Sequence, residues 1–220
     1  MRKKPITILV CLIVLLSGCT TPNSEETKSI FHGEEIQTTK PVIDFQLTTN
    51  DNTTYNFTEN TEGKVVVIAF LFTNCFDICP IVTYNLRTIH ETLNQSQLEY
   101  IEFITITVDP WRDNITTLTE WKDRTKSNWT HLTVSDIDDD SEEMKILNNV
   151  WANFGVGFTV EENATTSGRH HPADYNINHS TGTVLVDHLG HQRVWWGDYN
   201  WIVDLVEEDI FTLVEKAEKQ

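Results

Sequence analysis

Two cysteines separated by three residues stand directly after an apolar run, in the stretch FLFTNCFDICPIVTYNL that spans residues 70–86. Thiolates act as nucleophiles, as redox partners and as ligands for soft metals. A disulfide between Cys75 and Cys79 would close only a short loop, so it would restrict the unfolded chain little and stabilise the fold weakly. The spacing therefore favours reactive or metal-binding thiols over a purely structural disulfide.

The residues around these cysteines predict a connection between a strand and a helix. Residues 64–72 read KVVVIAFLF, a nearly continuous apolar run that is typical of a strand buried on both faces of a parallel sheet. Pro80 suits the first position of a following helix, which would make Cys79 its N-cap and leave Cys75 in the loop. Free amides at the start of a helix favour a thiolate over a thiol. The apolar stripe expected on this helix is Val82, Leu86, Ile89 and Leu93.

The rest of the chain predicts an α/β fold. The expected strands are residues 45–47 and 55–57, joined as a hairpin by a polar turn, then 101–108, 132–134, 183–186 and 194–196. The expected helices are marked by apolar residues from 115 to 121, by a cap at Ser141 and by apolar residues from 202 to 213. This order predicts a thioredoxin-like three-layer sandwich with a central mixed sheet and an N-terminal β-hairpin.

The first 19 residues predict a signal peptide rather than part of the folded domain. Three basic residues precede a short apolar run, residues 6–16, which is too short to span a bilayer stably. The sequence Leu-Ser-Gly-Cys that ends at Cys19 resembles a lipobox, in which the cysteine becomes the lipidated first residue; an ordinary signal peptide that happens to contain a cysteine is the alternative. Residues 20–40 predict a flexible polar tether, and residues 41–220 the folded domain. The predicted location is extracytoplasmic, with the protein lipid-anchored to the outer face of the cell membrane.

Charge and cysteine content restrict the functional classes further. The formal net charge of −17 argues against binding to nucleic acid, because the phosphate backbone requires a basic face. Of the four cysteines, Cys11 lies in the predicted signal peptide and Cys19 would carry the lipid. In an oxidising compartment Cys75 and Cys79 can therefore form a disulfide only with each other, or they can bind one other group together.

Three segments, taken in order, resemble the Sco/SenC family: FTNCFDICP at residues 72–80, VDPWRD at residues 108–113 and YNINHS at residues 175–180. The resemblance extends from about residue 41 to residue 214. It implies a thioredoxin-fold copper protein that helps to assemble the dinuclear copper centre of cytochrome c oxidase subunit II. The copper ligands that the resemblance implies are Cys75, Cys79 and His179.

The chemistry of this ligand set agrees with the resemblance. Two thiolates and an imidazole suit Cu(I), and the nitrogen also makes Cu(II) accessible. In ordinary thioredoxins a cis-proline precedes the strand that corresponds to residues 183–186 and contacts the disulfide partner. No proline occurs between His179 and Val186, which fits a metal ligand at this place instead of a residue that holds a substrate. The adjacent His170 and His171 predict a solvated loop, with extra copper capture as the alternative.

Four further charged residues near these segments have a structural and a functional interpretation. Asp77 lies between the cysteines. It is either an ordinary turn residue or a residue whose hydrogen bond to nearby backbone adjusts the properties of the metal or thiol site. Asp109, Arg112 and Asp113 follow a strand whose end lies near the thiol loop in this fold. They predict an ion pair with a helix cap or, alternatively, a contact with the partner protein.

Three functions from different classes follow from these residues. The first is a copper metallochaperone, which is not an enzyme and passes its metal by ligand exchange to cytochrome c oxidase subunit II or a similar copper acceptor. The second is a thiol-disulfide reductase, in which Cys75 and Cys79 keep the cysteines of the acceptor reduced. The third is a peroxide or redox sensor. His179 separates the first two, because disulfide reduction does not require it.

Overall fold

The computed structural model describes residues 29–162, 175–179 and 182–218. The strands are β1 (Glu34–Pro41), β2 (Gln46–Thr49), β3 (Thr54–Asn56), β4 (Val65–Leu71), β5 (Ile101–Thr107), β6 (Thr130–Thr133), β7 (Phe158–Glu162), β8 (Tyr175–His179), β9 (Gly182–Val186) and β10 (His191–Gly197). The helices are α1 (Phe57–Thr61), α2 (Ile78–Thr92), α3 (Gln95–Leu98), α4 (Ile115–Thr125), α5 (Glu142–Phe154), a 3-10 turn (Asp198–Asn200) and α6 (Val203–Glu218).

Eight of these strands form one mixed sheet in the order β1-β10-β9-β4-β5-β6-β2-β3. The central strand β4 pairs in parallel with β5 and antiparallel with β9. All seven residues of β4 are buried, as its continuous apolar sequence predicts, because both of its edges are paired and both of its faces are covered. The sheet therefore places its most apolar strand at the centre of the core.

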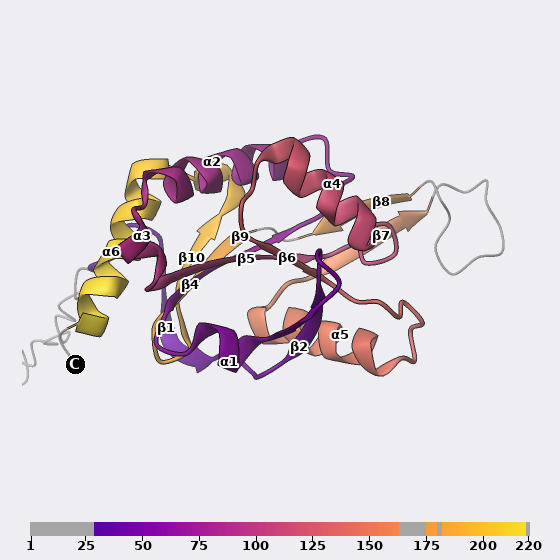
Figure 1. Cartoon of the computed structure of the whole chain (residues 1–220), viewed down its shortest axis with the longest axis horizontal. Helices are drawn as coiled ribbons and strands as arrows, with labels where there is room; N and C mark the ends of the chain where they lie inside the picture. Colours follow the sequence, from indigo (N-terminus) through magenta and orange to yellow (C-terminus); the bar gives the residue numbers. More distant parts are fainter. Residues whose placement is uncertain (1–28, 163–174, 180–181, 219–220) are drawn as a thin grey trace, which may run out of the picture.

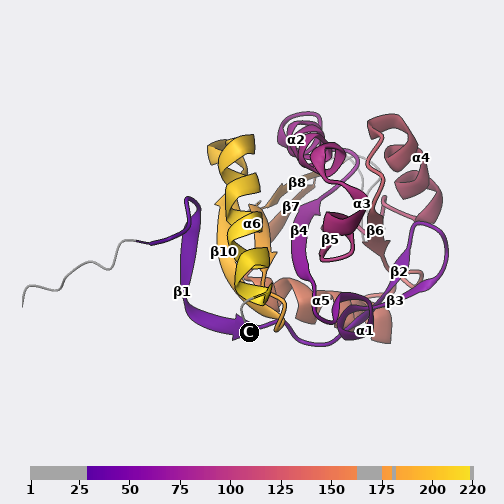
Figure 2. The same ribbon diagram turned by 60° about the vertical axis from the view of Figure 1, so that its left-hand side comes forward.

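Helices cover both faces of this sheet. Helices α2 and α4 lie over one face, and α1 and α5 lie over the other (Figures 1 and 2). Helix α6 packs against α2 and against β4. The predicted three-layer α/β sandwich is confirmed, and so is its N-terminal hairpin, in which β2 pairs antiparallel with β3.

Strands β7 and β8 form a second, two-stranded sheet that extends away from the main one (right of Figure 1). No strands are predicted here from the sequence, although FTVEE and YNINH both begin with alternating apolar and polar residues, because an alternation over only five residues is too short to distinguish a strand from a loop. Phe158 pairs with His179 at one end of this hairpin, and Glu162 pairs with Tyr175 at the other. None of the helices in the described ranges is both long and apolar enough to cross a bilayer.

The folded domain begins earlier than the predicted boundary at Pro41. Residues 34–41 form β1 on the edge of the sheet, paired with β10, so the prediction of a flexible tether is wrong for residues 34–40. An edge strand that is mostly exposed needs no apolar residues, and for that reason its polar sequence resembles a tether. Residues 20–28 and the predicted signal peptide, with Cys19, lie outside the described residues.

A buried carboxylate on α6 fixes the segment that leads into β1. Asp209 is completely buried, and its two oxygens accept hydrogen bonds from the backbone N–H groups of His32 (2.8 Å) and Gly33 (2.9 Å). The indole N–H of Trp196 donates to the same carboxylate at 3.0 Å. The neighbouring Glu208 forms only an exposed ion pair with the His32 ring.

This difference between adjacent acidic residues predicts different effects on stability. Asp209→Ala should lower the free energy of unfolding by about 2–4 kcal/mol, because one buried and two partly buried donors lose a charged acceptor. Glu208→Gln, the matched control, should lower it by less than about 1 kcal/mol. Urea unfolding of both variants measures the two values, and equal losses would contradict the role given to Asp209.

Candidate metal and thiol site

The cysteine loop connects the end of β4 to the start of α2. The parallel register of β4 and β5 pairs Leu71 with Thr107, so both strands end at the same edge of the sheet. The loop that follows β4 carries Cys75, and the turn that follows β5 carries the predicted charged residues. In a parallel sheet this edge is the usual place for a site, because the loops that leave neighbouring strands converge there.

Helix α2 begins two residues before the predicted position. Its first residue is Ile78 and its N-cap is Asp77, so the prediction that Cys79 is the N-cap is wrong. Pro80 is compatible with this start, because the N–H groups in the first turn of a helix have no acceptor within the helix. Any position of that turn therefore tolerates a proline, and Pro80 does not identify the first helical residue. The Asp77 side chain is exposed and makes no capping hydrogen bond.

The two sulfurs lie in different environments. Cys79 is completely buried and Cys75 is half-buried, and neither forms a disulfide. The backbone N–H of Cys79 donates to the Cys75 sulfur at 3.5 Å. A hydrogen bond from the Cys79 side chain, helped by amides at the start of α2 and opposed by burial, lowers the pKa of Cys75 to about 6. At neutral pH Cys75 is therefore mainly a thiolate, and the exposed ring of Phe76 stands beside it on the surface.

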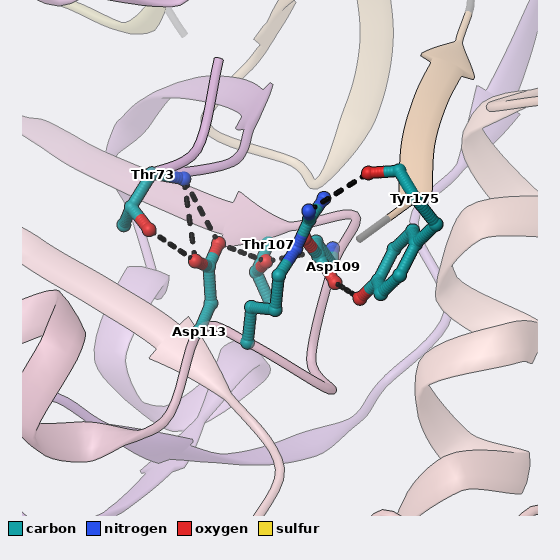
Figure 3. Close-up of polar contacts among 6 residues, drawn as sticks. Thr73, Thr107, Asp109, Asp113 and Tyr175 are labelled. Carbon is teal, nitrogen blue, oxygen red and sulfur yellow. Dashed lines mark hydrogen bonds and ion pairs between the residues drawn. The ribbon is translucent and has the colours of Figure 1, made fainter. Parts of the chain in front are cut away.

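Asp113 ties the cysteine loop to the end of β5 (Figure 3). Its buried carboxylate accepts hydrogen bonds from the Thr73 hydroxyl (2.5 Å), from the Thr73 backbone N–H (3.2 Å) and from the Thr107 hydroxyl (2.6 Å). Burial raises the pKa of Asp113 to about 6, and these hydrogen bonds oppose the shift. The carboxylate thus holds the chain two residues before Cys75.

Asp109 and Arg112 form the predicted ion pair, and they hold β8 as well as each other. The guanidinium Nε donates to Asp109, and Nη1 donates to the backbone carbonyl of Tyr175 at 2.9 Å. The Tyr175 hydroxyl donates to the second oxygen of the same carboxylate (Figure 3). The prediction that one of the three charged residues after β5 caps the next helix is wrong: the N-cap of α4 is Asn114, the residue after the motif, which accepts from the Thr117 N–H at 3.0 Å.

The structure places His179 at the end of β8, and its side chain lies outside the described part. The ladder between β4 and β9 pairs Ala69 with Thr183. Strand β8 belongs to the second sheet, where the backbone of His179 pairs with Phe158. His170 and His171 also lie outside the described residues. Among the side chains that are described, no group of three or more His, Cys, Asp or Glu residues could hold a metal ion.

Three residues of this site are not singled out by the sequence. Thr73 and Thr107 donate to Asp113, and Tyr175 connects β8 to Asp109. Threonine is common in strands and loops, so no local pattern distinguishes these two from the others. Tyr175 does open the segment YNINHS that carries the resemblance, but its partners lie more than sixty residues earlier in the chain.

Comparisons with known proteins identify relatives that share this fold. A family model described as SCO1/SenC matches residues 33–198. A SCO2-like protein of Rickettsia typhi (strain ATCC VR-144 / Wilmington) is 32% identical over 130 residues, which are 58% of this chain and 56% of the relative. The match therefore spans little more than half the length of that relative.

Two solved structures show the same architecture. Yeast Sco1 with copper bound has a TM-score of 0.64 and 24% identity, and the match covers 82% of this chain and 95% of that one. A SCO1/SenC family lipoprotein from Bacillus anthracis str. Ames has a TM-score of 0.60 and 24% identity, with 81% and 98% covered. At this level of identity the two structures show the shared fold.

The hydrogen bond between the thiols predicts an unusual pH dependence of alkylation. Cys75 should react with iodoacetamide with a midpoint near pH 6, and Cys79→Ala should move that midpoint upward, because the thiolate loses its strongest donor. Mass spectrometry of the alkylated peptide measures the rate at Cys75 separately from that at the buried Cys79. A wild-type midpoint above pH 8, like that of an ordinary thiol, would contradict the assignment.

Proposed function

This chain belongs to the SCO1/SenC family, and we propose that it is a copper metallochaperone. The protein delivers its copper ion to the dinuclear copper site of cytochrome c oxidase subunit II or a similar acceptor. The observation that carries the proposal is the pair of cysteines without a disulfide, one buried and one half-buried, with Cys75 held as a thiolate at neutral pH. A low-pKa thiolate at the surface beside a second sulfur suits the reversible binding of a soft ion.

The proposed ligands are Cys75, Cys79 and His179. The chemistry of the two sulfurs and one imidazole suits copper in either oxidation state. Two further observations support the set: the contact between Cys79 and the Cys75 sulfur, and the copper bound to yeast Sco1. The net charge of −17 agrees with a protein partner rather than a nucleic acid.

Delivery is a ligand exchange with no net electron transfer. A thiolate of the acceptor forms a bond to copper as the bond to Cys75 breaks, and the acceptor then replaces the remaining ligands in the same way. Cys75 is the accessible sulfur, so we infer that exchange begins there. The side chain of Phe76 is 90% exposed, on the surface that an acceptor must approach.

The proposed location is the outer face of the cell membrane, with the lipid on Cys19. The apolar run before Leu-Ser-Gly-Cys supports this, and so does the relative from Bacillus anthracis, which is described as a lipoprotein. Since residues 34–41 form β1, the proposed tether is only the part of the predicted one that lies between Cys19 and this strand. Such a tether keeps the domain close to a membrane-bound acceptor.

Removing the proposed imidazole ligand tests the metal site. His179→Ala should weaken copper binding by more than about 100-fold, since even residues that only support ligands cost 10–100-fold. The thiols should still oxidise to a disulfide at the wild-type rate. Competition with a copper chelator measures the affinity, with His32→Ala as the control because that ring forms only an exposed ion pair. Unchanged affinity in His179→Ala would refute the proposed ligand.

A thiol-disulfide reductase is the second candidate, favoured by the same pair of cysteines without a disulfide and by the low pKa of Cys75. In that reaction the Cys75 thiolate attacks a disulfide of the acceptor and forms a mixed disulfide. Cys79 then resolves it. The acceptor gains two electrons and two protons, and this chain is left with a Cys75–Cys79 disulfide.

Mixing experiments with a soluble subunit II domain separate the two functions. Copper-loaded protein should produce the visible absorption bands of the acceptor's copper centre when the acceptor cysteines are already reduced, and His179→Ala should produce few or none. Metal-free, reduced protein should leave an oxidised acceptor largely unreduced. Rapid reduction of that acceptor, equally fast with His179→Ala, would favour the reductase instead.

A further inference from the structure

The hairpin that carries His179 is not part of the main sheet. Strands β7 and β8 pair only with each other among the described strands. An isolated two-stranded sheet is at best marginally stable in water, so its position depends on contacts with the body of the protein. The described side chains of this hairpin that pack into the core are Tyr175, Ile177 and Val160.

Tyr175 makes several polar contacts that connect this hairpin to the main body. It is the first residue of β8, and its side chain is 3% exposed. Arg112 contacts it in two ways, through Nη1 to the backbone carbonyl at 2.9 Å and through the guanidinium carbon, 3.8 Å from the centre of the ring. The hydroxyl and the Arg112 Nε both donate to the buried Asp109, one to each oxygen. The ring, the carbonyl and the hydroxyl of one residue are therefore all held (Figure 3).

These contacts continue as far as the cysteine loop. The Asp109 backbone N–H donates to the Thr107 hydroxyl at 2.9 Å, and that hydroxyl donates to Asp113 at 2.6 Å. Asp113 in turn accepts from Thr73, two residues before Cys75. A chain of hydrogen bonds thus runs from the start of β8 to the start of the cysteine loop (Figure 3).

We propose that Asp109, Arg112 and Tyr175 form a clamp that positions β8, and with it His179, against the cysteine loop. Copper affinity then depends on three side chains that never touch the metal. The inference rests on the proposed function, because it concerns how the third ligand is held. Tyr175 and His179 are four residues apart in one strand, about 13 Å, and positions 175, 177 and 179 share one face of β8.

The electrostatics of the clamp favour a single arrangement. The one guanidinium neutralises the one carboxylate, and each Asp109 oxygen has its own donor, as a buried ion pair requires. Burial, together with the hydrogen bond to Asp109, raises the pKa of Tyr175, so its hydroxyl remains a donor at every physiological pH.

Removing one hydroxyl tests the clamp with little change in packing. Tyr175→Phe keeps the buried ring and deletes only the donor to Asp109. It should weaken copper binding about 10- to 100-fold, the range seen when a residue that orients a metal ligand is lost. Tyr84→Phe is the matched control, because that ring is 59% exposed on α2 and the same deletion should leave affinity unchanged. Equal affinities in wild type and Tyr175→Phe would overturn the proposal.

A double-mutant cycle separates positioning from general destabilisation. If Tyr175 acts through His179, then Tyr175→Phe should cause no further loss of copper affinity in a His179→Ala background. Independent losses that multiply would show that the hydroxyl supports the site in another way, and would overturn the inference. Urea unfolding of the metal-free proteins reports any change in global stability separately.

A measurement without copper keeps this inference distinct from the proposed function. In metal-free protein, Tyr175→Phe should speed hydrogen exchange in the β7–β8 hairpin at least about tenfold relative to β4, because the hairpin opens locally when its clamp is weakened. Unchanged exchange there would overturn the clamp even if copper binds. Failure of the wild-type protein to bind copper would refute the proposed function, while the exchange result would still decide the clamp.

A second substitution covers the case in which Tyr175→Phe does not fold. Arg112→Lys retains the positive charge next to Asp109 but cannot hold the carboxylate and the Tyr175 carbonyl in the same planar geometry. It should reproduce both the faster exchange of the hairpin and the weaker copper binding. Wild-type behaviour in both measurements would count against the clamp.

Discussion

The parallel pairing of β4 with β5 is the constraint on which the rest of the structure depends. Its register places Leu71 opposite Thr107, so the cysteine loop and the turn with the charged residues leave the sheet side by side. Burial of β4 on both faces enforces that register, because a slip by one residue would exchange its two faces and disrupt the packing of both. The apolar core therefore determines where the polar chemistry is located.

Two buried carboxylates convert this adjacency into a defined geometry. Burying a carboxylate is unfavourable unless hydrogen bonds and an opposite charge compensate, and both kinds of compensation occur here. Asp113 receives donors from the cysteine loop and from β5, whereas Asp109 receives Arg112 and the hydroxyl of Tyr175. Because each carboxylate needs donors from separate segments, the unfavourable burial is relieved only when those segments are correctly assembled.

The asymmetry of the two thiols suits the proposed exchange of metal. Cys79 lies in the first turn of α2 and is buried, so its position is fixed by the helix. Cys75 lies on the loop, more exposed, and its thiolate is stabilised by the donors of that same helix turn. One sulfur thus serves as a fixed ligand and the other as the accessible one. The same asymmetry would serve a reductase, which is why the role of His179 separates the two functions.

The sequence by itself determined the elements whose apolar pattern is strong and the residues whose chemistry is distinctive. Strand β4, helix α2, the β2–β3 hairpin and the cysteine pair all follow from local spacing, because burial on both faces, helical periodicity and thiol chemistry leave clear patterns. Only the tertiary structure decided the polar edge strand β1, the pairing of β7 with β8, the start of α2 at Ile78 and the partners of Asp109 and Asp113. These depend on edge pairing and on hydrogen bonds between segments 40 to 66 residues apart, and such contacts leave no periodic pattern along the chain.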